Sequence, residues 1–202
     1  MKLTPLLLLS IFCFPFSITA QKSVKIGNQT WMAENLSVTR FNNGDEIPQI
    51  ESPVTWAQST SPAWSYYENE SKYANSGLLY NYYTVTDPRG LCPAGWRVPN
   101  KKDLKELYQF IGGDHMRYTL RSTSGWGEGR NGTDIYGFKG APSGYRMRDG
   151  FFKRQSQMGF WWLSDKDFFV FSWKDITMDM ENVWKDKSTF PSSAGMSVRC
   201  IK

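Results

Sequence analysis

Three cysteines, Cys13, Cys92 and Cys200, constrain the fold of this 202-residue chain more than any other feature. Cys13 lies in an apolar run that follows a single lysine, is too short to span a bilayer and precedes a small residue at Ala20. This pattern predicts a secretory signal peptide over residues 1–20. Its removal would leave Cys92 and Cys200 as the only thiols of an exported chain.

The compartment of an exported chain is oxidising, so an even number of cysteines predicts a disulfide between Cys92 and Cys200. The bridge would close a loop of about 110 residues and contribute roughly 4–5 kcal/mol to the free energy of unfolding. Two free, buried cysteines are the alternative. The wide spacing argues against a metal site or a redox pair, in which thiols lie within a few residues of each other.

The length that remains suits one domain, residues 21–202, and the net charge of the whole chain is a modest +5. Charges of both signs mix along most of the chain, without the basic stripe that is typical of nucleic-acid-binding proteins. After residue 20, no apolar segment is long enough to span a bilayer. We therefore expect no nucleic-acid partner and no transmembrane segment in the mature chain.

Local patterns predict an α+β domain with small antiparallel sheets and one long helix at about residues 100–112. Asn100 suits the N-cap of this helix, apolar residues follow at helical spacing, and Gly112 or Gly113 ends it. Short strands are expected in residues 23–41, 78–87, 159–165, 168–173 and 194–202, and a short helix near residues 54–58. Polar and aromatic residues alternate in a long ordered connection at residues 49–76, and aromatic residues pack the glycine-rich loops of residues 123–150.

Catalytic and cofactor signatures are missing from this sequence. His115 is the only histidine, so a catalytic triad or a zinc site would have to be built around it, and an exposed turn residue is the simpler interpretation. Carboxylates that a glycosidase could pair are present, but a chain of this size contains such residues by chance. They are Glu68, Glu70, Asp165, Asp167, Asp175 and Asp179. We expect a protein without enzymatic activity, cofactor or metal.

Several long segments resemble the Fibrobacter succinogenes major paralogous domain, the FISUMP family, in the same order along the chain. They include "VKIGNQTWMAENLSVTRFNNGDEIP", "GLLYNYYTVTDPRGLCPAGWRVPNKKDLKELYQFIGG", "GFWWLSD" and "SVRCIK", and the resemblance covers residues 23–202. It implies a bacterial protein, common in Bacteroidetes, that is exported to the outer cell surface, the medium or the periplasm. It also implies a C-type-lectin-like fold, with close termini and long ordered loops, and no catalytic activity.

In lectin-like domains a "CP-x-GW" segment and a cysteine of the last strand often form a disulfide. Cys92, Pro93, Gly95, Trp96 and Cys200 match that pattern, and Trp96 would fill the core beneath the loop. Two short calcium-binding motifs of sugar-binding lectins, Glu-Pro-Asn and Trp-Asn-Asp, are absent from the sequence. Calcium-dependent sugar binding is therefore not expected.

The leading functional hypothesis is a non-catalytic module that binds a protein or a glycan through aromatic side chains near the glycine-rich loops. The candidate binding residues are Trp126, Tyr145, Trp161, Trp173 and Trp184. A structural or adhesive subunit of a surface assembly is the alternative. An enzyme related to the formylglycine-generating fold, which uses a pair of cysteines, is a third hypothesis; the predicted disulfide weighs against it.

Overall fold

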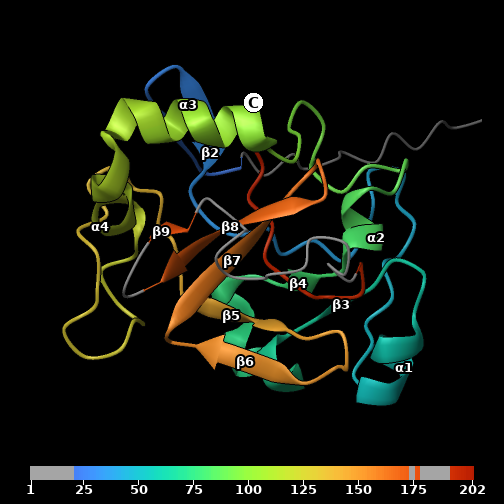
Figure 1. Cartoon of the computed structure of the whole chain (residues 1–202). Helices are drawn as coiled ribbons and strands as arrows, with labels where there is room; N and C mark the ends of the chain where they lie inside the picture. The colour runs from blue at the N-terminus through green and yellow to red at the C-terminus, as the bar shows by residue number, and fades with distance from the viewer. Residues whose placement is uncertain (1–20, 173–175, 178–191) are drawn as a thin grey trace, which may run out of the picture.

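The structure is a computed structural model that describes residues 21–172, 176–177 and 192–202 (Figure 1). The predicted signal peptide, Trp173 and Trp184 lie outside the described residues. The described chain begins with a hairpin of β1 (Ser23–Ile26) and β2 (Gln29–Met32), joined through Gly27 at φ +60°. Glycine adopts this left-handed backbone without strain. The hairpin confirms two of the short strands expected in residues 23–41, and no further strand follows there.

A five-stranded sheet forms the centre of the molecule, in the order β6-β5-β7-β8-β9 (Figure 1). Its strands are β5 (Ser143–Arg146), β6 (Phe152–Gln155), β7 (Met158–Leu163), β8 (Asp167–Ser172) and β9 (Ile176–Thr177). Strands β5 and β7 are parallel, and the other neighbours are antiparallel. The structure confirms both strands expected from the apolar runs in this region.

The apolar runs of β7 and β8 are continuous because both faces of the sheet are covered. Successive side chains point to opposite faces, so Trp161 joins one buried cluster with Phe169, and Trp162 joins another with Phe168. Both tryptophans are fully buried. The sheet therefore separates two apolar cores.

Helix α3 (Lys101–Ile111) lies across one end of the molecule and is the helix that the sequence predicts (Figure 1). Asn100 and Asp103 form a reciprocal capping box, which satisfies two backbone N–H groups at the helix start. Gly112 ends the helix in the left-handed conformation. Leu104 and Leu107 are buried in the same core as Trp161.

The strand expected over residues 78–87 is wrong beyond its first residues. Only β4 (Leu79–Tyr80) is a strand, paired with β3 (Trp64–Ser65), and the chain then turns into α2 (Tyr82–Val85). The reason is Asn81, whose side chain accepts a hydrogen bond of 3.0 Å from the Thr84 N–H and so caps a helical turn. The residues after this cap are aromatic and β-branched, which favours a strand by composition, but tertiary context makes them helical in α2.

The remaining helical segments are short. They are α1 (Pro53–Gln58), which confirms the short helix expected near residues 54–58, α4 (Met116–Leu120), and the 3-10 segments η1 (Tyr67–Asn69), η2 (Ser71–Ser76) and η3 (Gly113–His115). His115 is exposed beside α4, as expected. Small sheets with separate helices confirm the α+β class.

The last residues form a buried, extended segment that pairs with several elements in turn. Met196 bridges to Tyr80 of β4, Ser197 to Trp161 of β7, and Ile201 to both Trp31 and Arg97. This segment was expected to be a strand, but its partners change too often for one continuous ladder. Thr30 and Lys202 exchange backbone hydrogen bonds of 3.3 and 3.0 Å, so the first hairpin and the last residue of the domain are neighbours.

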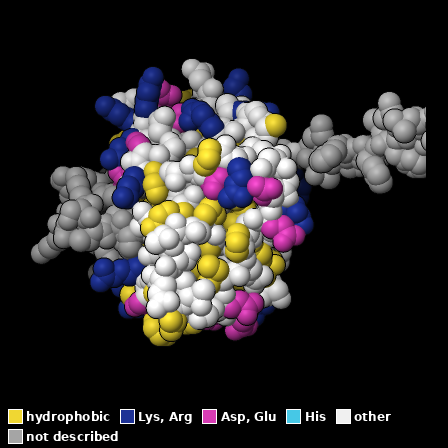
Figure 2. All heavy atoms as spheres, turned by 90° about the vertical axis from the view of Figure 1, so that its right-hand side faces the viewer, with side chains coloured by type: hydrophobic (Ala, Val, Ile, Leu, Met, Phe, Trp, Pro, Cys, Tyr) yellow, Lys and Arg dark blue, Asp and Glu magenta, His cyan; other side chains and the backbone are white. Residues whose placement is uncertain are grey.

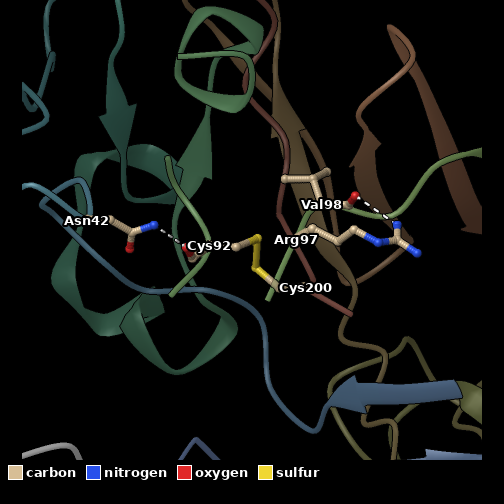
Figure 3. The surroundings of a disulfide bond; sticks show 5 residues. All are labelled: Asn42, Cys92, Arg97, Val98 and Cys200. Atoms are coloured by element: carbon tan, nitrogen blue, oxygen red, sulfur yellow. Dashed lines mark hydrogen bonds between the residues drawn. A yellow bond between two sulfur atoms is a disulfide. The ribbon is translucent and has the colours of Figure 1, made fainter. Parts of the chain in front are cut away.

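The disulfide between Cys92 and Cys200 is present and ties the loop before α3 to this last segment (Figure 3). Asn42 supports the loop, because its side-chain amide donates a hydrogen bond of 2.7 Å to the Cys92 carbonyl oxygen. Trp96 is only half-buried and packs at the edge of the core, with the Lys202 ammonium 4.7 Å from its ring centre. The expectation that Trp96 fills the core is thus corrected.

Candidate functional site

Three of the predicted binding aromatics are core residues. Trp126, Tyr145 and Trp161 are 5%, 8% and 0% exposed. Trp161 stacks on Phe169 with ring centres 4.9 Å apart, and Tyr145 lies 4.6 Å from Phe160. Buried rings cannot offer their faces to a ligand, so these three positions are corrected from binding residues to packing residues.

Trp126 has an identifiable structural task in the glycine-rich region. Its indole N–H lies 3.1 Å from both the Gly140 carbonyl oxygen and the Ser122 hydroxyl, and the Arg121 guanidinium lies 4.7 Å from its ring centre. The ring therefore fastens two loop segments together. This confirms that aromatic side chains order the glycine-rich loops.

A hollow with half-buried aromatic side chains lies instead between η1, η2 and β6. Tyr67, Tyr73 and Phe152 line a cavity of about 500 Å³, together with Glu68, Lys153, Arg154, Gln155 and Gln157. Tyr67 is buried, and its ring centre is 5.2 Å from that of Tyr73 and 5.3 Å from that of Phe152. Tyr67 thus supports the two half-buried rings from behind.

The backbone on both sides of this hollow is strained. Glu68 and Asn69 have φ values of +53° and +57°, and Arg154 and Ser156 have values of +70° and +60°. Non-glycine residues seldom adopt this left-handed conformation, and where they do, they concentrate at functional sites. All four residues lie in the two segments that form the walls of the hollow.

A second, polar cavity of about 560 Å³ adjoins the first. Gln155 lines both, and η2 supplies Tyr73 to the first cavity and Asn75 and Ser76 to the second. Hydroxyl, amide and charged groups dominate its walls, among them Glu34, Ser37, Ser122, Ser124 and Lys139. We call the two cavities together the η2 groove, with an aromatic part and a polar part.

Asn35 and Arg199 form the base of the polar part. The Asn35 side-chain oxygen accepts hydrogen bonds from Trp161 Nε1 at 2.7 Å and from Arg199 Nε at 3.0 Å, while its amide donates to the Ser76 carbonyl oxygen at 2.8 Å. One side chain thus connects the C-terminal segment, the central sheet and η2.

The Arg199 guanidinium is fully buried and has no carboxylate in contact among the described residues. It also donates to the backbone carbonyl oxygens of Met32 at 3.3 Å and of Phe138, whose ring centre lies 4.3 Å away. Burial lowers the pKa of Arg199 to about 9, because a charged group loses hydration there. Because a pKa of about 9 is still above neutral pH, Arg199 keeps its positive charge beneath the polar part of the groove.

No sequence pattern pointed directly to this groove. The sequence predicts a long ordered connection over residues 49–76. Its alternation of aromatic and polar residues is the one local feature from which Tyr67 and Tyr73 could have been proposed. Phe152 and Arg199 carry no comparable signal, because each is brought to the groove by tertiary folding. The groove depends on segments far apart in the sequence.

Other candidate chemistry in the described residues finds no site. No group of three or more histidine, cysteine, aspartate or glutamate side chains there could hold a metal ion. Asp167 pairs with Lys101 and Glu70 with Lys72, so each of these carboxylates already has a lysine partner. Asp175 and Asp179 lie outside the described residues.

A further cavity of about 400 Å³ lies beside the disulfide and is lined by Val85, Cys92, Trp96 and Arg97, among others. On the right-hand side of the molecule, which carries α2, hydrophobic side chains gather in the middle and charged ones surround them (Figure 2). The disulfide-side cavity has one aromatic ring, which Lys202 already contacts. The η2 groove combines more aromatic and polar groups.

These features define a class: a disulfide-bridged α+β domain with close termini and a groove of aromatic and polar side chains. The chain belongs to the Fibrobacter succinogenes major domain family, whose model matches residues 24–202. This confirms the family resemblance seen in the sequence. No curated protein and no solved structure matches the chain. Within the described residues, no helix combines the length and the apolar character needed to cross a membrane.

Proposed function

We propose that this protein is an exported, non-catalytic binding module that holds an oligosaccharide in the η2 groove. The observation that carries the proposal is the adjacency of an aromatic and a polar cavity that share Gln155 and η2. Aromatic rings pack against the apolar faces of sugar rings, while amides, hydroxyls and charged groups bond their hydroxyl groups. Each cavity has the volume of a small-molecule site, so linked sugar units are needed to fill both.

The proposal includes a C-type-lectin-like fold and removal of residues 1–20 during export. Neighbouring chain ends and the Cys92–Cys200 bridge support this fold, and the bridge is compatible with an oxidising compartment. Within this fold, binding at the η2 groove needs no calcium ion, since its polar part supplies neutral and charged side chains directly. The ligand would then be recognised by the side chains themselves.

The enzyme alternative finds no support at the cysteines. Cys92 and Cys200 are bonded to each other and are 5% and 0% exposed. A cysteine enzyme needs an accessible thiolate, and neither residue offers one in this state. The other alternative is a structural or adhesive subunit of a surface assembly. The binding experiment below distinguishes it from an oligosaccharide-binding module.

The test is a glycan array probed with the oxidised protein and two double variants. Tyr73→Ala with Phe152→Ala removes the two half-buried rings of the groove, and we expect affinity for every bound glycan to fall at least about tenfold. The matched control, Tyr118→Ala with Phe110→Ala, removes one tyrosine and one phenylalanine that are exposed outside the groove and should bind as the unmodified protein does.

Equal binding by the groove variant and the unmodified protein would place the glycan site elsewhere and overturn the proposal. Silence on the array, with stoichiometric protein partners recovered from envelope extracts, would favour the subunit of a surface assembly. Sedimentation of the unmodified protein alone and with those partners would identify the assembly.

A further inference from the structure

The charged side chains of the η2 groove are unequal in sign. Its cations are Lys139, Lys153, Arg154 and Arg199, and its anions are Glu34 and Glu68. From this imbalance we infer that the oligosaccharide is acidic and carries carboxylate groups, as chains of uronic acids do. This inference rests on the proposed function and specifies its ligand.

The cations of the aromatic part are available to a ligand. Lys153 and Arg154 are exposed, and no ion pair joins either of them to a carboxylate in the described part of the chain. Arg154 donates a hydrogen bond of 3.2 Å to the neutral amide oxygen of Gln157. Glu68 accepts a hydrogen bond of 3.4 Å from the Tyr73 hydroxyl. The two cations thus face a single carboxylate that is already hydrogen-bonded.

The polar part adds one exposed and one buried cation. Glu34 lies between Lys22 and Lys139, at 3.4 and 3.8 Å, so one carboxylate is shared by two ammonium groups. Asp134 is half-buried next to Lys139, and its carboxylate accepts a hydrogen bond of 2.7 Å from the Lys139 backbone N–H. This carboxylate offsets part of the positive charge of the polar part. The cations still outnumber the carboxylates when Asp134 is counted.

Arg199 acts at a distance, because it is fully buried and makes no direct contact with a ligand. Buried charges are screened less by salt and water than exposed ones, so its field extends into the cavity above it. A carboxylate held there would be attracted by Arg199 and contacted by Lys139. Arg199 is thus a positioning residue, and the exposed cations are the contact residues.

The cavity beside α3 does not share this arrangement. Lys101 of α3 is paired with Asp167, and the cavity beside it is lined by one aromatic residue, Tyr108. The η2 groove combines three aromatic residues with an excess of cations. It is therefore the site to which the acidic ligand is assigned.

The experiment measures binding of uronate trisaccharides, trigalacturonate among them, and of their carboxyl-reduced neutral counterparts, by isothermal titration calorimetry. We expect the acidic member of at least one pair to bind about tenfold more tightly at about 20 mM NaCl, and the preference to shrink at about 300 mM because exposed charges are screened. The double variant Lys139→Gln with Lys153→Gln should lose the preference.

The control is Lys105→Gln with Lys166→Gln, which removes the same charge from exposed lysines that line neither part of the groove. Lys166 matches Lys139 in backbone conformation, with φ values of +56° and +50°. The control should keep the full preference. Equal loss in both double variants would show an effect of net charge alone and overturn the inference.

Failure of this inference differs from failure of the proposed function. Equal affinity for acidic and neutral trisaccharides, with loss of both in Tyr73→Ala with Phe152→Ala, would overturn the acidic ligand and keep the binding module. Absence of binding to any trisaccharide pair, together with a silent glycan array, would overturn both.

Discussion

Asn35 shows how one side chain can determine both packing and the shape of a site. Its oxygen receives the Trp161 and Arg199 donors and its amide reaches Ser76, so it joins the central sheet to the groove wall. Gly77, next to Ser76, has no room for a side chain, since an added Cβ would lie 2.5 Å from the Asn35 Cβ. The approach of η2 to Asn35 therefore requires glycine at this position.

We predict that Asn35→Ala lowers the free energy of unfolding by about 3 kcal/mol, because buried donors of Trp161 and Arg199 lose their acceptor. Urea unfolding followed by tryptophan fluorescence measures this change. The control is Asn75→Ala, an exposed residue of the same groove, with an expected effect of about 0.5 kcal/mol or less. Similar small effects in both variants would contradict the central role of Asn35.

Aromatic residues also mark the limit of prediction at the residue scale. The sequence indicates that Trp126, Trp161 and Tyr145 are aromatic and near glycine-rich loops, but burial depends on which face of a strand meets a second layer. Tyr73 and Phe152 are half-exposed because η2 and β6 lie at the edge of the fold. That edge is created by tertiary contacts, which local pattern does not contain.

Local signals were sufficient for α3 and insufficient for residues 78–87. In α3 the cap, the apolar spacing and the terminal glycine all favour the same helix, and the structure confirms it. In residues 78–87 the aromatic composition favours a strand, whereas Asn81 favours a helix start, and contacts with Ala63 decide between them. Ala63 N–H donates to the Asn81 side-chain oxygen at 3.1 Å, which orients the cap.

The start of α3 leads to a prediction about pH. Burial alone would raise the pKa of the Asp103 carboxyl, but hydrogen bonds from the Arg97 guanidinium and the Asn100 backbone hold it below its ordinary value. The unfolded state therefore binds the proton more readily, and stability from Asp103 is present above its unfolded pKa of 3.8 and lost as pH falls through the lower folded value.

We expect Asp103→Asn to be destabilised by about 1–3 kcal/mol at pH 7, and the difference from the unmodified protein to shrink below about pH 4. Urea unfolding from acid to neutral pH measures both quantities. Glu106→Gln, an exposed change on the same helix, should show neither effect. A difference that stays constant across the acid range would contradict the role of the Asp103 charge.

The whole molecule depends on a C-terminal segment that contacts nearly every layer. Its residues pair with β2, β4, β5, β7 and the loop before α3, and the disulfide fixes the same loop to it. The cysteine pattern predicted the bridge, and the α+β class followed from short elements of both kinds. The sequence could not predict the order of the strands, because it is set by contacts between distant residues.

Removal of the bridge tests its contribution at this scale. We predict that Cys92→Ser with Cys200→Ser lowers the free energy of unfolding by roughly 4–5 kcal/mol, mainly because the unfolded chain gains freedom. Urea unfolding of oxidised, reduced and double-serine protein gives the value. A decrease in the free energy of unfolding below about 1 kcal/mol would show that backbone pairing alone holds the C-terminal segment in place without the disulfide.

The hydrogen-bonded neighbours Thr30 and Lys202 have a consequence for how such a domain can be combined with others. Strand β1 and the last residues of the chain both lie beside β2, so a glycine-serine linker would join residue 202 to residue 21, and the chain could be opened at a loop elsewhere as a circular permutant. The same geometry lets the domain be spliced whole into a surface loop of a host protein. The C-terminal end lies beside α3, whereas β6 lies at the opposite end of the molecule (Figure 1). The aromatic part of the groove, which β6 lines, would therefore face away from the host.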